Sequence, residues 1–387
     1  MRRIQITDKI KGVAWTYSQK LEKEDNFKKG ESPKARLLVL SEKLKKSSTK
    51  IHVLVCKAKK GKTAKYNKYS GNLYTALAEY VKVIYDNYDG LNALLPSEYD
   101  SHIGQKINNV LSIHKISDIS EIKVKLRGKK LRPFYELVVE AMRYDRVQQE
   151  FMPDYIRDLS IKTCVYCNSQ FATTASVQKI VKLKKGYDVK NIDASCYDLD
   201  HNKAKSKYPY LCTNFYNLQP CCSSCNRRKN DRELDFSLYY EDGDTNTTPV
   251  HFAMAESDIV HFRISNNGKG IKPYLCNEGV DTPPSVADKS SMAGKMNDML
   301  NVQGIYDEHE DIVEEILWKH KIYSSGFMTA TINQIKSLGL VGFDMKRFIL
   351  GGYYDREGDF LRRPLSIMKN DLWEQLERTR GRKHITL

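Results

Sequence analysis

Residues 164–170, CVYCNSQ, and residues 197–229, YDLDHNKAKSKYPYLCTNFYNLQPCCSSCNRRK, decide the fold that this sequence predicts. Each stretch contains a Cys-x-x-Cys pair, Cys164 with Cys167 and Cys222 with Cys225. Two such pairs can present four thiolates to one zinc ion at zinc–sulfur distances of about 2.3 Å. The sequence therefore predicts a structural Zn site whose ligands are these four cysteines.

The remaining cysteines are expected to be isolated thiols. Cys221 adjoins Cys222, but only Cys222 has the two-residue spacing to Cys225, so Cys221 is expected to be a buried or spare thiol. No apolar run resembles a secretion signal or a membrane span, so we expect a cytoplasmic protein without disulfides or membrane contacts. The isolated thiols are Cys56, Cys196, Cys212, Cys221 and Cys276.

The two cysteine pairs are separated by 54 residues, which is more than a compact zinc ribbon needs. Asp200, His201 and Asn217 lie in this interval. Near-alternating β-branched residues in 171–201, with a Lys-Lys-Gly turn at 184–186, predict a hairpin there. Something other than a bare zinc-binding loop is therefore expected between the pairs.

The order of these parts resembles the HNH endonucleases of the ββα-metal type that carry a four-cysteine zinc site. The shared order is Cys-x-x-Cys, a hairpin, Asp200-His201, Asn217, and then Cys-x-x-Cys followed by Asn226 and Lys229. The resemblance covers about 70 of the 387 residues. It implies hydrolysis of a phosphodiester by one divalent metal and a histidine base.

The resemblance also implies a role for each residue. His201 would be the general base, since an imidazole accepts a proton near neutral pH. Asp200 and Asn226 would bind Mg or Mn through oxygen atoms, and Asn217 would hold the strand that presents His201. The basic side chains expected to contact phosphates are Lys203, Lys205, Lys207, Arg227 and Lys229.

The net charge of +15 is concentrated in two blocks. Residues 1–70 contain 20 basic and 6 acidic residues, and residues 161–230 contain 12 and 4. Such blocks favour a nucleic-acid partner, because neutralised phosphates release counterions. Lysine-rich surfaces that only aid solubility are the alternative. The Lys-rich segment at 57–71 also has two interpretations. It could contact phosphates and stack its aromatic side chains on bases, or it could be a solvated linker.

We expect an α+β chain that is mainly helical, with a central zinc-stabilised ββα-metal (HNH) module. Residues 1–155 are expected to form an α-rich domain with a basic arm in 1–33 and a helix from Pro33, and residues 156–240 the module. Residues 241–387 are expected to be loop-rich, with short β-like runs such as HFRIS at 261–265, and then helical from about residue 290.

The expected function is a metal-dependent endonuclease that cuts DNA, most readily double-stranded DNA. The C-terminal third is similar, at lower specificity, to HNH subunits of bacterial anti-phage defence systems that pair with an ATPase, which implies defence or restriction and a partner ATPase. The alternative is a zinc-stabilised nucleic-acid-binding or partner-docking protein that does not cut, or whose nuclease is silent without its partner.

Overall fold

A computed structural model gives the fold of the chain. It describes residues 1–47, 53–55, 66–68, 73–126, 130–182, 186–244, 247–323, 325–339, 342–352 and 359–379. The chain divides into two compact units, each built from separated segments. Unit 1 contains 1–5, 156–198 and 220–387, and unit 2 contains 6–155 and 199–219. These units cross the boundaries of the three consecutive segments expected from the sequence.

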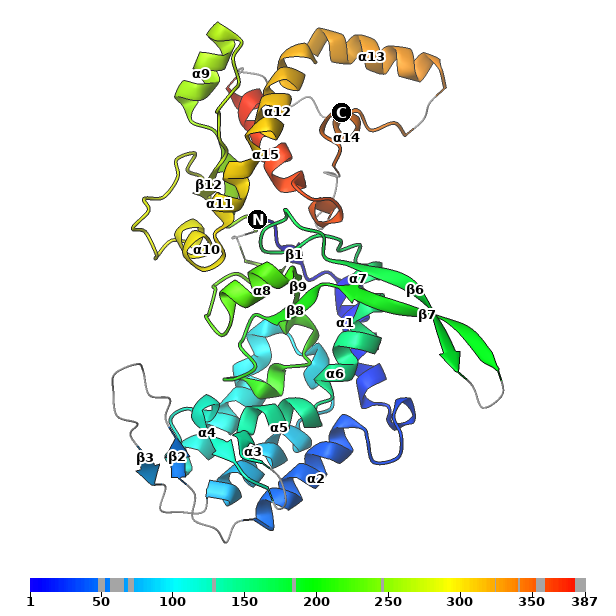
Figure 1. The fold of residues 1–387 in the computed structure, drawn as a ribbon, viewed down its shortest axis with the longest axis vertical. Coiled ribbons are helices and arrows are strands. Elements are labelled where there is room, and N and C mark those ends of the chain that lie inside the picture. The colour runs from blue at the N-terminus through cyan, green and yellow to red at the C-terminus, as the bar shows by residue number, and fades with distance from the viewer. Residues whose placement is uncertain are drawn as a thin grey trace. The chain divides into compact units, whose positions relative to one another are not determined.

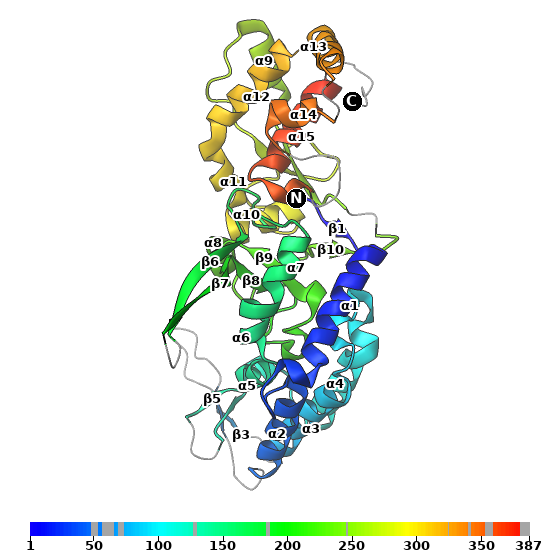
Figure 2. The same cartoon turned by 90° about the vertical axis from the view of Figure 1, so that its right-hand side faces the viewer.

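Unit 2 is built mainly of helices, of which α1 to α4 pack side by side in Figure 2. The helix expected from Pro33 is confirmed as α2, where the Ser32 hydroxyl caps the first turn by accepting a hydrogen bond from the Ala35 N–H. The helices are α1 (Asp8–Glu22), α2 (Pro33–Lys45), α3 (Leu73–Asp86), α4 (Gln105–Ile113), α5 (Phe134–Ala141) and α6 (Tyr144–Arg146), and α7 (Met152–Asp158) begins here. The short strands are β2 (Val53–Val55), β3 (Tyr66–Lys68), β4 (Lys123–Val124) and β5 (Arg132–Pro133).

The expectation of a loop or arm in residues 1–33 is wrong for most of that segment, because α1 occupies 8–22. Ile10, Ala14, Tyr17 and Leu21 are buried along one face of α1 at three- and four-residue spacing. Helix α1 includes a glycine at position 12. Burial of this apolar face outweighs the propensity cost of one glycine, which is about 1 kcal/mol.

The middle of the motif, residues 199–219, packs into unit 2 through buried polar contacts. The Tyr17 hydroxyl donates to the Thr213 carbonyl at 2.7 Å, and the Asn214 amide donates to the Leu91 carbonyl at 2.8 Å. Tyr99 donates to the Asn214 side-chain oxygen at 2.7 Å. The N-terminal helices therefore form the direct support of the segment that contains His201.

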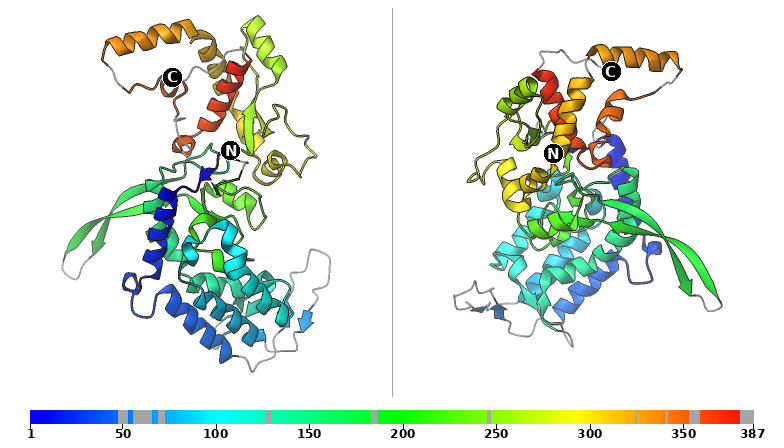
Figure 3. Two further views of the ribbon diagram at one scale, coloured as in Figure 1. Left: turned by 180° about the vertical axis from the view of Figure 1, so that it is seen from behind. Right: turned by 45° about the horizontal axis from the view of Figure 1, so that its top comes forward.

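Unit 1 contains the cysteine pairs and the long hairpin, which is confirmed. β6 (Thr173–Lys182) and β7 (Tyr187–Cys196) pair antiparallel along ten residues each (Figure 3). The predicted turn at 184–186 lies outside the described residues except for Gly186. β8 (Asp198–His201) pairs with β9 (Leu218–Cys221), and the boundary between the two units falls within both strands. α8 (Ser223–Lys229) follows β9.

The rest of unit 1 is a small sheet covered by helices, shown in yellow to red in Figure 1. Side chains of α15 (Ser366–Arg378) bond to the edge of β11 (Val250–Ala253), where Asp371 accepts from the Phe252 N–H at 3.0 Å. The other strands are β12 (Tyr274–Asn277), antiparallel to β11, and β1 (Ile4–Gln5), parallel to β10 (Tyr239–Tyr240). The other helices are α9 (Glu256–Ser265), α10 (Met292–Leu300), α11 (Val302–Tyr306), α12 (Glu310–Ile322), α13 (Ser325–Ser337) and α14 (Met345–Leu350).

The β-like interpretation of residues 261–265 is wrong, because these residues end helix α9. Only Ile259 and Phe262 of α9 are buried, so the alternation that resembled a strand is a one-sided helical contact. The expected helix in the C-terminal part is confirmed by α12, whose Val313, Ile316 and Leu317 are buried. A short helix that is buried along one narrow stripe has few apolar positions, so its sequence pattern is hard to distinguish from that of a strand.

The described part of the chain is mixed α and β, with many helices and small two-stranded sheets. Its helices include none that is both long and apolar enough to span a membrane. The Lys-rich segment at 57–71 lies outside the described residues except for β3.

Candidate functional site

Four buried cysteines of unit 1 lie close enough together to bind one metal ion. The sulfur atoms of Cys164, Cys167, Cys222 and Cys225 lie within 4.8 Å of one another. On a tetrahedron with zinc–sulfur distances of about 2.3 Å, the sulfurs are separated by about 3.8 Å, so the cluster fits a zinc ion. Cys221 is buried and does not belong to the cluster. The structure thus brings together the four cysteines chosen by spacing.

The thiols of the cluster are hydrogen-bonded to one another, and their pKa shifts go in both directions. Hydrogen bonds from the thiols of Cys164, Cys222 and Cys225 hold the pKa of Cys167 well below its usual range, while burial raises the pKa of Cys164. Burial raises the pKa of the isolated Cys212 and Cys276 to about 12. A thiolate is the form that binds metal, so Cys212 and Cys276 are neutral core residues and not ligands.

Asn168 holds the first cysteine pair in place, a role that its sequence context did not indicate. This residue has a left-handed φ of 51° and is fully buried. Its side-chain amide donates to the Phe360 carbonyl at 3.0 Å and accepts from the Ile367 N–H at 3.1 Å. The Tyr306 hydroxyl donates to the Cys167 carbonyl at 2.7 Å. The first pair is therefore bonded to the C-terminal helical part of its own unit.

The second cysteine pair starts helix α8 and positions Asn226. The Cys222 sulfur caps the helix by accepting from the Cys225 N–H at 3.5 Å. One turn further on, the Asn226 Nδ2 donates to the Asp198 Oδ2 at 3.0 Å. Because a carboxylate only accepts, this bond fixes which end of the amide is nitrogen and identifies Oδ1 as its acceptor end. Asp198 was not singled out from the sequence.

Asp198 and Asp200 are alternate residues of strand β8, so their side chains leave the strand on the same face. Asp200 is buried and Asp198 is partly exposed. The sequence signal for Asp198 was present in this two-residue spacing. An Asp-x-Asp sequence is common on strands, however. Only the contact with Asn226 shows that Asp198 differs from other aspartates in such sequences.

His201 ends strand β8 and lies buried within unit 2. Its Nε2 lies 3.0 Å from the carbonyl oxygen of Cys212. A carbonyl only accepts, so the neutral ring carries its proton on Nε2 and has its basic lone pair on Nδ1. Local backbone contacts thus select the tautomer of His201.

Tyr144, which was not singled out from the sequence, packs against His201. The two rings have centroids 4.9 Å apart at an interplanar angle of 48°. The Tyr144 hydroxyl donates to the Leu199 carbonyl at 2.8 Å, and the Lys205 ammonium lies 5.0 Å from the centre of the Tyr144 ring. Tyr144 therefore ties the N-terminal helices to strand β8 beside the histidine.

Arg143 sets the direction in which Tyr144 leaves the helix. Arg143 has a left-handed φ of 60° between α5 and α6. Its guanidinium holds this turn by donating to the Glu31 carbonyl and to the Glu31 carboxylate, both at 3.1 Å. A left-handed arginine costs roughly 1 kcal/mol, so these bonds maintain a position that the backbone alone disfavours.

Asn217 is buried and bonds to the loop that follows His201. Its side-chain oxygen accepts from the Lys203 N–H at 2.7 Å, and its amide nitrogen donates to the Leu211 carbonyl at 2.9 Å and the Lys203 carbonyl at 3.2 Å. The Asn202 N–H donates to the Asn217 carbonyl at 2.9 Å. These bonds close the loop between β8 and β9, and they are of the kind that the resemblance implied.

The basic residues expected to contact phosphates differ in exposure. Lys203, Lys207 and Arg227 are exposed, and Lys205 is partly exposed over Tyr144. Lys229, the last residue of the short helix α8, is 1% exposed, so the free chain does not present it to a phosphate. The sequence alone does not show which face of this helix is buried.

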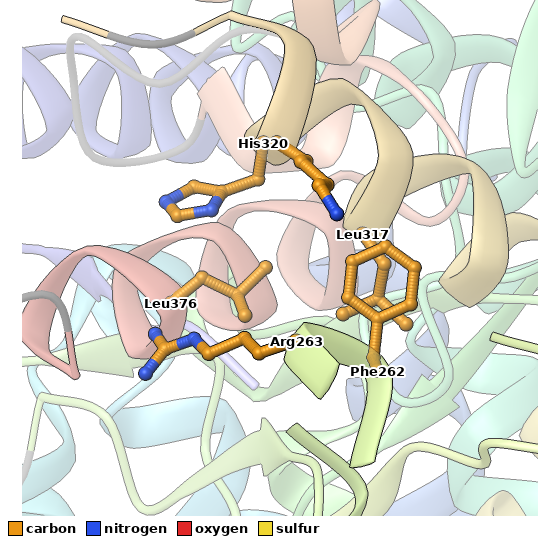
Figure 4. Close-up of a pocket in the computed structure, with 6 residues that line it drawn as sticks. Phe262, Arg263, Leu317, His320 and Leu376 are labelled. Atoms are coloured by element: carbon orange, nitrogen blue, oxygen red, sulfur yellow. The ribbon is translucent and has the colours of Figure 1, made fainter. Parts of the chain in front are cut away.

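A cavity of about 210 Å³ lies among α9, α12 and α15 of unit 1 (Figure 4). It is smaller than ordinary ligand pockets of about 300 to 1,000 Å³. At its edge the His320 Nε2 donates to the Glu377 carboxylate at 2.7 Å. The cavity is lined by Phe262, Arg263, Leu317, His320, Lys321 and Leu376, none of which belongs to the predicted site.

A search of protein-family models, of curated proteins and of solved structures finds no match to this chain.

Proposed function

We propose that this chain is a metal-dependent HNH endonuclease that hydrolyses phosphodiester bonds of DNA. One observation carries the proposal: His201 ends a strand with its Nε2 bonded to the Cys212 carbonyl at 3.0 Å. A general base needs one defined basic nitrogen, and this bond supplies it on Nδ1. The cluster of four cysteines beside Asn226 in the sequence supports the same proposal.

In the proposed reaction, His201 takes a proton from a water molecule as the water oxygen attacks phosphorus. The phosphorus–oxygen bond to the leaving sugar breaks, and that oxygen is protonated from solvent. The resemblance assigns Asp200 and Asn226 to Mg or Mn, which when bound would neutralise charge on the phosphate and the leaving oxygen. Asp198 would orient Asn226 through the 3.0 Å bond to its amide.

The zinc that the cluster fits would be structural. Four thiolates complete a tetrahedral shell and leave no ligand position for water. In this proposal zinc holds the start of α8, and with it Asn226, while the hydrolytic chemistry belongs to a second metal and to His201. A role in bacterial anti-phage defence, and a partner ATPase, stay predictions from the resemblance.

The test is cleavage by the purified full-length chain. Supercoiled plasmid, linear duplex, single strands and RNA are incubated with Mg, with Mn, and with a chelator that removes both. We expect metal-dependent cutting of the DNA substrates and loss of cutting in His201→Ala. Binding to DNA with no cutting under any of these metals would favour the alternative, a zinc-stabilised binding protein.

A further inference from the structure

Helix α1 of unit 2 has an exposed face opposite its buried one, and this face carries an uncharged strip. Helix α1 is the dark blue helix that can be followed in Figure 2. Positions three or four residues apart lie beside one another on a helix surface. The strip, called the Trp15 strip below, consists of the exposed residues Gly12, Trp15, Thr16 and Gln19, which have this spacing.

Trp15 is 56% exposed, whereas tryptophan side chains are highly buried on average. Within the part of the chain that the structure describes, its ring packs against no other aromatic ring and its Nε1–H donates to no acceptor. Single exposed apolar side chains are common on protein surfaces, so exposure alone does not identify a site. The surroundings of Trp15 are what point to a ligand.

Gly12 leaves the helix surface bare on one side of Trp15. No described atom lies within 4 Å of the position that a Cβ would occupy at Gly12, so packing does not require a glycine there. A glycine inside a helix lowers the stability of that helix. Gly12 lies one turn before Trp15, so a flat molecule can approach the ring from that side without meeting a side chain at position 12.

Exposed lysines border the Trp15 strip on both sides. With 3.6 residues per turn, Lys11 lies on the side of Trp15, and Lys9 and Lys20 lie on the side of Thr16. The lysine stems reach several ångströms beyond the helix backbone. An anionic ligand laid along the strip therefore meets positive charge on both sides.

The carboxylates of α1 leave most of this charge uncompensated. Asp8 is 3.9 Å from Lys11, and both side chains are largely exposed, so the pair is weak. The Glu22 carboxylate accepts hydrogen bonds from the Ser18 hydroxyl at 2.6 Å and the Gly90 N–H at 2.8 Å. The two lysines on the other side of the strip form no ion pair with any described residue.

We propose that the Trp15 strip binds single-stranded nucleic acid, with an unpaired base stacked on the Trp15 ring and the bordering lysines on backbone phosphates. Proteins that bind single strands without sequence preference combine aromatic stacking with positive charge along the backbone. Within a duplex the neighbouring base pairs cover the faces of each base, so the strip selects unpaired strands. The inference goes beyond the proposed nuclease function, because this binding uses neither His201 nor a divalent metal.

The charge around Trp15 favours a nucleic acid over a protein partner. Tryptophan is enriched at protein interfaces, but lysine is depleted there. The Trp15 strip contains one large apolar side chain among glycine and polar residues, and it has lysines on both sides. A ligand that is anionic along its length and has flat apolar faces matches both features, and a nucleic-acid strand is such a ligand.

The experiment measures binding of the full-length chain to labelled strands by fluorescence anisotropy, without added Mg or Mn. The probes are oligo(dT) and oligo(U) of about 12 nucleotides and a DNA duplex of the same length. Trp15→Leu removes the aromatic ring and keeps an apolar side chain, while Trp15→Phe keeps a ring that can stack. Circular dichroism and thermal unfolding confirm that each variant is folded.

A second pair of variants tests the charge. Lys9→Ala with Lys11→Ala removes two lysines that border the strip. The matched control, Lys28→Ala with Lys29→Ala, removes two exposed lysines of the same unit that lie outside α1, so both double variants lose the same charge.

We expect Trp15→Leu to bind the single strands about 5- to 100-fold more weakly than wild type, and Trp15→Phe to lose less, because a phenyl ring still stacks. Binding of the duplex should change little in either variant. The quenching of tryptophan emission that stacking causes should be lost in both. The Lys9/Lys11 variant should lower the log–log salt slope for oligo(dT) by up to about 1.4, and the control should leave it unchanged.

Trp15-dependent binding of either strand supports the site, and the tighter of oligo(dT) and oligo(U) identifies the class of strand. Equal binding of both strands by wild type and Trp15→Leu would overturn the inference, and so would an equal loss of duplex binding. Unchanged strand binding with a smaller species in sedimentation would assign Trp15 to a contact between copies of the chain, and would overturn it as well. Trp15-dependent binding by a chain that cuts nothing would refute only the proposed nuclease.

Discussion

The ring of Tyr144 lies against the imidazole of His201, with centroids 4.9 Å apart, and the two residues come from different parts of the sequence within one unit. The Tyr144 hydroxyl also bonds to the carbonyl of Leu199, two residues before His201 on β8. The Tyr144 hydroxyl thus fixes the strand, and the Tyr144 ring fixes the imidazole of His201. Because these are separate contacts, substitutions can separate the two effects.

Tyr144→Phe should keep the ring against His201 and lose the bond to the buried Leu199 carbonyl. We expect a loss of about 1 to 3 kcal/mol in the free energy of unfolding, with cleavage by folded protein changed little. Tyr144→Ala should in addition lower kcat by about 10- to 100-fold, because the base is no longer held in place. Thermal unfolding and single-turnover cleavage measure the two effects.

The matched control for Tyr144 is Tyr80→Phe. Tyr80 is buried in the same unit, and its hydroxyl has no partner among the described residues. Removing it should therefore cost less stability than Tyr144→Phe. If Tyr144→Ala cut DNA at the wild-type rate once folded, the ring would have no part in positioning His201.

His201→Ala should preserve the zinc and the DNA affinity while lowering the cleavage rate by roughly 100- to 10,000-fold, as expected for loss of a general base. Asp200→Ala and Asn226→Ala should instead raise the Mg concentration needed for half-maximal cleavage. A Mg titration for each variant distinguishes the two classes. Full activity of His201→Ala at saturating Mg would show that another group is the base.

Asp198→Ala should raise the Mg requirement in the same direction as Asn226→Ala, because it removes the acceptor that orients the Asn226 amide at 3.0 Å. Loss of such a supporting contact typically weakens metal binding by about 10- to 100-fold. The matched control is Asp298→Ala, a surface carboxylate of the same unit paired with Lys289. An unchanged Mg titration in Asp198→Ala would mean that Asn226 needs no orienting partner.

Cys225→Ser should lower the zinc content below one per chain and destabilise unit 1, since the cluster would retain three of its four sulfurs. Cys196→Ser is the control, because Cys196 is an exposed free thiol outside the cluster. Elemental analysis and thermal unfolding are the measurements. Soluble, stable wild-type protein without zinc would contradict the assignment of the cluster.

The sequence by itself determined the four cysteines of the cluster, the hairpin and helix α2. Each depends on contacts within a few residues: a Cys-x-x-Cys turn brings two sulfurs together, and Ser32 caps the turn that begins at Pro33. Local geometry of this kind is fixed by spacing and residue type, whatever the rest of the chain does.

Only the tertiary structure decided which side chains support His201 and Asn226, and which are buried. Tyr144, Asn168 and Asp198 each contact a partner that is distant in the sequence. Lys229 is buried because it lies on the inward face of α8. Each of these residue types is common in helices and strands without such a role. The physical reason is that burial and long-range hydrogen bonds depend on how separate segments pack, which no local spacing encodes.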